Sequence, residues 1–233
     1  MPRPRKDQSD QPDFSRDFDH LELDRTKPIG PQVYEAVRLA IILSKLPSGA
    51  RLNEPELAGY LGVSRTPVRE AYLRLVGDGL IQSRPQVGSI VAPRDENRVI
   101  EGIIVRRALE CEVVQILAQK QPSLDSLNPL LALQESAVLM GDPVAFFRAD
   151  EAFHAELARL AAIPTAWRLA HSAKAHTDRA RMQLMSGIEN RIGLALEEHR
   201  KLLRFIQAGD AAAARETVSN HINSVFDAVG KQS

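Results

Sequence analysis

Asp150 and His154 stand four residues apart and together could bind a metal ion. They follow Asp142-Pro143, a dipeptide that favours a helix start, and apolar residues recur around them at helical spacing. Residues four apart share one face of a helix, so the carboxylate and the imidazole could close on the same ion. Because the same spacing suits an ordinary surface hydrogen bond, this pair alone is weak evidence for a metal site.

His199 and His221 could add two imidazoles to this pair. They lie on either side of Gly209-Asp210, where glycine can end one helix and aspartate can cap the next. His199 precedes this turn by ten residues and His221 follows it by eleven, so antiparallel helices would bring them to nearly the same height. One carboxylate and three imidazoles could form the ligand set of a divalent zinc, nickel or manganese ion.

Residues 53–78 have the pattern of a helix-turn-helix. A short helix begins at Asn53 or Glu54 and ends at Gly62, and a longer helix follows from Ser64 to about residue 78. In this geometry the start of the second helix can enter the major groove of DNA.

The start of that second helix carries groups that suit DNA. Ser64, Arg65 and Thr66 lie at its positive end, where hydroxyl and backbone N–H groups favour phosphate. Arg69 shares a face with Arg65, and guanidinium groups bind guanine edges or phosphates through two hydrogen bonds. An ordinary solvated helix face is the alternative for the two arginines. The apolar residues of this helix are expected to pack inward: Val68, Leu73, Leu75 and Val76.

The elements around these residues predict a mainly α-helical chain of two domains. Residues 28–94 contain three helices and a small β-hairpin formed by residues 80–83 and 89–91, which together predict a winged helix-turn-helix. Residues 95–233 repeat apolar helical periods, which predict an antiparallel all-helical bundle of six or seven helices. Breaks are expected at Pro122, Asp142-Pro143, Pro164, Gly187 and Gly209-Asp210. Residues 1–27 are polar and charged, which predicts a flexible tail.

Composition narrows the class of protein. The net charge is +0, but residues 28–94 hold 8 basic and 5 acidic side chains, the sign expected for a DNA-binding half. Cys111 is the only cysteine, which excludes an internal disulfide and favours a core position. An apolar stretch long enough to span a membrane is missing, and the first residues lack a signal core, so a cytoplasmic location is expected.

Residues 46–91 resemble the GntR family of regulators. The matching pieces run through the predicted winged helix: Pro47-Ser48-Gly49, Glu56-Leu57-Ala58, Leu61 to Ala71, Gly79-Leu80-Ile81 and Gly88. The resemblance implies that Ser64, Arg65, Thr66 and Arg69 contact DNA and that Gly88, at the tip of the wing, allows a close approach to the minor groove. Pro55 departs from the pattern, because some relatives have a basic, DNA-contacting residue there.

The second half resembles the FCD ligand-binding domain of the FadR-like branch of that family. The matching pieces are sparse: Arg106 to Glu110, Asp150 to His154, Glu198-His199, Ala208-Gly209-Asp210 and His221-Ile222. The resemblance implies that Asp150, His154, His199 and His221 hold a metal ion inside the bundle.

Arg106 corresponds to the family's arginine near the effector pocket and could clamp a small carboxylate. Its alternative is an ion pair with a glutamate of the bundle. Arg181 and Asn190 could line the same pocket. His171 and His176 match no ligand position and are expected to be partly exposed, whereas Trp167 is expected to pack in the core or at a subunit contact.

These observations predict a DNA-binding transcription regulator, with repression the commoner mode in the resembled family. A homodimer would bind a palindromic operator, and a small carboxylate or sugar-acid effector at the metal would change its affinity for DNA. Two alternatives remain open at this point: a metal sensor whose effector is the ion itself, and a metal-dependent enzyme. A general base outside the ligand set is not evident, and an enzyme would give no reason for the winged helix.

Overall fold

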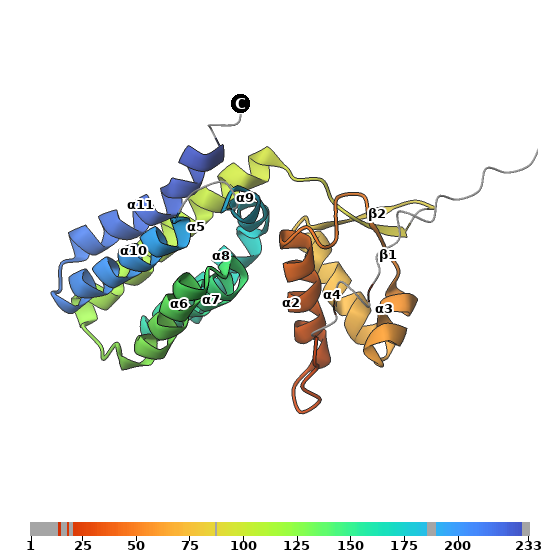
Figure 1. Ribbon diagram of the computed structural model, residues 1–233, viewed down its shortest axis with the longest axis horizontal. Helices are drawn as coiled ribbons and strands as arrows, with labels where there is room; N and C mark the ends of the chain where they lie inside the picture. The colour runs from red at the N-terminus through yellow and green to blue at the C-terminus, as the bar shows by residue number, and fades with distance from the viewer. Residues whose placement is uncertain (1–13, 15–17, 19–20, 87, 186–189, 230–233) are drawn as a thin grey trace, which may run out of the picture. The chain divides into compact units, whose positions relative to one another are not determined.

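The protein forms two compact units, Met1–Asp95 and Glu96–Ser233, and is drawn in Figure 1. The computed structural model describes residues 14, 18, 21–86, 88–185 and 190–229. Among the described helices, none is both long enough and apolar enough to cross a membrane.

Three helices of the N-terminal unit form the predicted helix-turn-helix and its support. They are α2 (Ile29–Ile42), α3 (Glu54–Leu61) and α4 (Arg65–Gly77). The side chain of Asn53 caps α3 by accepting a hydrogen bond from the backbone N–H of Glu56, and Gly62 ends the helix in the left-handed region with φ 59°. Ser64 occupies the N-cap position of α4 in an extended conformation, but its side chain makes no capping hydrogen bond.

The predicted β-hairpin is present, and a third strand extends it. Strands β2 (Ile81–Arg84) and β3 (Gly88–Val91) pair antiparallel, and β1 (Arg51–Leu52) pairs with the other edge of β3. Strand β1 was not predicted, because two residues are too few to show the alternation that identifies a strand.

Helix α4 packs on α2 through a narrower stripe than predicted. Val68 and Leu75 are buried as expected, but Leu73 is 64% exposed and Val76 is 39% exposed. Val68, Ala71, Tyr72 and Leu75 follow the three- and four-residue spacing of one helix face. Leu73 and Val76 lie beside that stripe, so their predicted inward packing was wrong.

The described part of residues 1–27 differs from a flexible tail. Phe14 and Phe18 are buried, and Phe14 lies with its ring centroid 6.5 Å from that of Tyr60. Arg25 donates hydrogen bonds of 3.1 and 3.2 Å to two carbonyl groups at the C-terminal end of α3. Carbonyl groups at the C-terminal end of a helix lack hydrogen-bond donors within the helix, and Arg25 supplies two such donors. The composition of the segment could not predict this contact.

The described part of the C-terminal unit contains seven α-helices, in agreement with the predicted bundle. They are α5 (Glu96–Lys120), α6 (Asn128–Met140), α7 (Pro143–Leu160), α8 (Pro164–Ala173), α9 (Ala175–Met185), α10 (Arg191–Gln207) and α11 (Ala211–Val229), with a short 3-10 helix η2 (Asp125–Leu127) before α6. Asp142 caps α7 by accepting from two backbone N–H groups, and Gly209 has φ 72° between α10 and α11. The predicted break at Gly187 lies outside the described residues.

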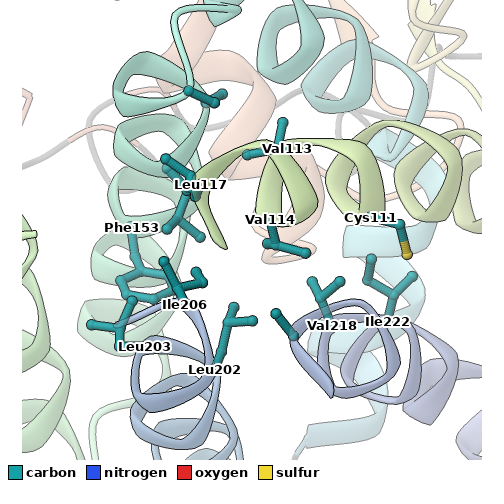
Figure 2. Packing of buried hydrophobic residues seen from close by; sticks show 14 of the residues in the cluster. Cys111, Val113, Val114, Leu117, Phe153, Leu202, Leu203, Ile206, Val218 and Ile222 are labelled. Carbon is teal, nitrogen blue, oxygen red and sulfur yellow. The ribbon is translucent and has the colours of Figure 1, made fainter. Parts of the chain in front are cut away.

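Helix α5 is the central helix of this unit: it packs along α11 and also contacts α7, α8, α9 and α10 (Figure 1). Figure 2 shows side chains of α5, α7, α10 and α11 pointing toward one another in a continuous apolar core. The labelled members include Val114 and Leu117 of α5, Phe153 of α7, Ile206 of α10 and Val218 of α11. Cys111 belongs to this core, as predicted.

Gly102 allows α5 to approach the junction of α8 and α9. A Cβ atom at this position would lie 2.6 Å from the Thr177 hydroxyl and 2.7 Å from the Ala173 carbonyl oxygen, closer than van der Waals contact. We expect Gly102→Ala to lower the free energy of unfolding by about 1–3 kcal/mol, because backbone must move to relieve the overlap. Urea unfolding would measure this. Gly59→Ala is the control: a Cβ there meets no atom within 4 Å, so stability should hold or rise.

Candidate metal centre and DNA interface

The structure brings Asp150, His154, His199 and His221 together inside the bundle. Helix α7 carries the first two, α10 carries His199 and α11 carries His221. One potential ligand atom from each residue lies within 4.8 Å of those of the others, and all four residues are buried. Three helices that are separate in the sequence therefore converge on one polar cluster.

The atoms at the centre of this cluster suit a cation. Oδ1 of Asp150 lies 3.5 Å from Nε2 of His199 and 3.8 Å from Nε2 of His154. Both of these Nε2 atoms are buried without a hydrogen-bond partner. Leaving a buried polar atom unpaired is costly, so two such atoms facing one carboxylate fit a site that accepts a metal ion.

In each of the three imidazoles, Nδ1 faces a side-chain oxygen that orients the ring. Nδ1 of His154 lies 2.8 Å from Oε2 of Glu110, and Nδ1 of His221 lies 2.6 Å from Oε2 of Glu198. A nitrogen that faces a carboxylate oxygen carries the ring proton, which leaves the lone pair on Nε2. This is the arrangement by which proteins orient histidine ligands and raise their basicity.

His199 is oriented by a neutral partner instead. Its Nδ1 lies 2.8 Å from Oε1 of Gln134, and the amide nitrogen of Gln134 donates to the Ala149 carbonyl at 3.5 Å. Sequence reasoning missed Gln134 because it stands on α6, away from any ligand motif. Glu110 and Glu198 lie within the matched motifs, but their pairing with histidines was not foreseen.

The electrostatics of the cluster favour a charged Asp150 and neutral rings at His199 and His221. Burial alone would raise the pKa of Asp150, but Arg181, whose Nη1 lies 2.8 Å from Oδ2, holds it well below its ordinary value. Burial lowers the pKa of His199 well below 6.5 and, against the hydrogen bond with Glu198, also lowers that of His221. An ionised carboxylate and neutral imidazoles are the forms that bind metal.

These pKa shifts predict that the metal-free protein loses stability in mild acid. Because the pKa values of His199 and His221 return toward 6.5 on unfolding, the unfolded chain takes up protons first as the pH falls. Their contribution is complete above about pH 6.5 and is lost progressively below it. Urea unfolding with a chelator present, between about pH 7.5 and 5.5, would show this fall. The depressed pKa of Asp150 acts only at lower pH, so a flat profile in this window would contradict the prediction.

The residues proposed for effector binding lie in different places. Arg106 is buried and forms the ion pair that was its alternative interpretation, with Nε 2.6 Å from Oε1 of Glu110. Arg181 is buried against Asp150. Asn190 is exposed at the N-cap position of α10 with φ 56°, outside the buried cluster.

Trp167 packs against the core, as one of its predicted alternatives required, and its ring stacks on His154 with centroids 5.8 Å apart. It is the only tryptophan of the chain, so its fluorescence can report on the cluster. His171 and His176 are buried rather than partly exposed, and Nε2 of His171 lies 3.1 Å from Oε2 of Glu151. The prediction failed because it rested on the absence of a ligand motif, which does not determine burial.

In the N-terminal unit, all residues predicted to contact DNA are on the surface. Ser64, Arg65, Thr66 and Arg69 are exposed over the first turns of α4, and Gly88 is exposed in the wing with φ 92°. Pro55 occupies the first turn of α3, where its missing N–H costs little. A winged helix with a basic helix end, followed by a helical bundle with a buried polar centre, is the architecture of a two-domain DNA-binding regulator.

Comparisons with known proteins agree with this class. The model of the bacterial regulatory proteins of the gntR family matches residues 30–91, and the FCD domain model matches residues 102–224. The chain therefore belongs to the GntR family of transcriptional regulators and carries a C-terminal FCD domain. It is a DNA-binding regulator and not an enzyme.

Individual relatives cover most of the chain. An HTH-type transcriptional regulator in an unstable DNA locus of Streptomyces ambofaciens is 35% identical over 84% of this chain and 82% of its own length. The HTH-type transcriptional repressor RspR of Escherichia coli is 30% identical over 89% of this chain and 92% of its own. The solved structure of E. coli McbR/YncC has the same fold, with a TM-score of 0.76 and 23% identity over 88% of this chain and 98% of that one.

Proposed function

We propose that the protein is a homodimeric repressor whose affinity for its operator is controlled by a small carboxylate or sugar acid bound at a divalent metal ion. The observation that carries this proposal is the set of three buried histidines. In each of them Nδ1 faces a side-chain oxygen, and in two of them, His154 and His199, Nε2 faces Asp150 and has no hydrogen-bond partner. Asp150, His154, His199 and His221 would hold the ion, for which zinc, nickel and manganese suit the donors. The ion would supply a Lewis acid that binds a carboxylate oxygen.

The charges around the cluster favour an anionic effector. Glu110 pairs with the guanidinium group of Arg106, and Asp150 pairs with that of Arg181. The charges of these four side chains therefore nearly cancel. A divalent ion would add two positive charges in a buried place, where uncompensated charge is costly. A small acid could neutralise that charge and accept hydrogen bonds from either guanidinium.

The surface of the N-terminal unit supports binding to operator DNA through Ser64, Arg65, Thr66, Arg69 and Gly88. Two copies related by a twofold axis would match a palindromic site, which is why we propose a homodimer. The name of the relative RspR favours repression. An operator-binding protein acts where the chromosome lies, so we place it in the cytoplasm.

Fluorescence anisotropy on operator DNA selected from a random library tests this function. The metal-loaded protein should bind tightly, and the correct acid should weaken binding by about 5- to 150-fold, the range of ordinary allosteric coupling. If Zn²⁺, Ni²⁺ or Mn²⁺ alone changes the affinity to this extent and no acid adds to it, the ion itself is the effector. Affinity that responds to neither metal nor acid would contradict the proposal.

A further inference from the structure

Glu110 contacts both Arg106, which would bind the effector, and His154, which would bind the metal ion. Its Oε1 accepts a hydrogen bond from Nε of Arg106 at 2.6 Å, and its Oε2 lies 2.8 Å from Nδ1 of His154. Nη2 of Arg106 lies 3.3 Å from the same Oε2. One carboxylate thus bridges the arginine that would bind the effector and a histidine that would bind the ion.

The partner of His154 differs from those of the other two histidines. Gln134, which holds His199, is a neutral amide, and Glu198, which holds His221, has a side chain 33% exposed. The side chain of Glu110 is 7% exposed, and its two oxygens face the Arg106 guanidinium and the His154 ring. An ionic interaction is strongest where water is excluded, so Glu110 should have the largest influence of the three on ligand basicity.

The space beside this bridge is small. The cavity that touches Glu110, His154 and Trp167 measures about 10 Å³ and is otherwise lined by apolar side chains. That volume holds about one water molecule. Glu110 already engages Nε and Nη2 of Arg106, so a carboxylate ligand that pairs with either of these nitrogens competes with Glu110 for the guanidinium.

We propose that Glu110 is a positioning residue that couples anion recognition at Arg106 to metal affinity at His154. An effector carboxylate that pairs with Arg106 weakens the bond between Arg106 and Glu110. The charge of Glu110 is then directed more fully to the imidazole of His154, which becomes a stronger ligand. Because coupling between two sites is reciprocal, a bound ion in turn strengthens the binding of the carboxylate. This inference rests on the proposed metal and effector sites.

Zn²⁺ affinity, measured by chelator competition and followed by Trp167 fluorescence, tests the link to the ion. Glu110→Gln keeps the shape but removes the charge and should weaken Zn²⁺ binding by about 10- to 100-fold, the usual effect of losing such a partner. Glu110→Asp, which restores the charge, should recover part of that affinity. Glu197→Gln, the same change at an exposed position of α10, is the control and should leave the affinity unchanged.

Acetate, a weak chelator, tests the link to the anion. In the wild type, saturating acetate should strengthen Zn²⁺ binding, and in Glu110→Gln this enhancement should shrink several-fold; thermal unfolding checks that the variant is folded. Equal Zn²⁺ affinity in Glu110→Gln and wild type, or an equal acetate enhancement, would overturn the inference. So would a loss in Glu110→Asp as large as in Glu110→Gln, because the charge would then be irrelevant. A wild type that binds no Zn²⁺, Ni²⁺ or Mn²⁺ would instead remove the proposed metal site, which distinguishes the two failures.

Discussion

The wild-type protein is expected to copurify with close to one divalent metal ion per chain, and the double variant His199→Ala, His221→Ala with almost none. The two substitutions remove half of the ligand set and leave Asp150 and His154 on one face of α7. A single carboxylate and imidazole hold a divalent ion far more weakly than four converging ligands, and the loss should exceed the effect of any substitution outside the set. Elemental analysis of the purified proteins would measure metal per chain.

His171→Ala is the matched control for this experiment. His171 is also a buried histidine of the bundle, but it pairs with Glu151 and stands outside the four-residue cluster. Its removal should leave the metal content near that of the wild type. If the double variant holds as much metal as the wild type, the cluster is not the metal site and its histidines pack or bind an effector without an ion.

Removing Arg65 and Arg69 is expected to abolish most specific binding to the operator while the fold remains intact. Both side chains are exposed at the start of α4, so their loss leaves no cavity in the core. Each arginine that grips a base edge contributes about 1–3 kcal/mol, or about 5- to 150-fold in affinity. Anisotropy titrations of Arg65→Ala, Arg69→Ala and the double variant, on operator and on unrelated DNA, would separate base contacts from phosphate contacts.

Arg74→Ala provides the comparison on the same helix. The Arg74 guanidinium lies 3.7 Å above the ring of Tyr34, so this substitution should reduce stability slightly and leave operator affinity nearly unchanged. A phosphate contact would show itself as equal loss on both DNAs and a smaller dependence on salt. If Arg65→Ala and Arg69→Ala bind operator as tightly as the wild type, α4 does not read the DNA through these residues.

Much of the fold could be predicted because its signals are local. Asn53, Gly62, Asp142 and Gly209 begin or end helices through the conformation of one residue and a hydrogen bond to a near neighbour. The convergence of His199 and His221 could be predicted for the same reason, since equal distances from a helix turn determine equal heights in a hairpin.

Other features depend on contacts between distant parts of the chain. The short strand β1 forms because it can pair with an edge of β3. Phe14 is buried because its ring lies between those of Phe18 and Tyr60, with centroid distances of 5.9 and 6.5 Å. Leu73 is exposed because it lies beside the stripe of α4 that packs inward, which consists of Val68, Ala71, Tyr72 and Leu75.

The sequence by itself determined the winged helix, the helical bundle and the four residues that meet inside it. Only the tertiary structure decided what surrounds them: Gln134 from α6 holds His199, Glu110 is shared between Arg106 and His154, and Asp150 pairs with Arg181. Helical periodicity shows which face of a helix is turned inward, because it depends on neighbours along the chain. It does not show which side chain of another helix arrives opposite, because that depends on the packing of the whole bundle.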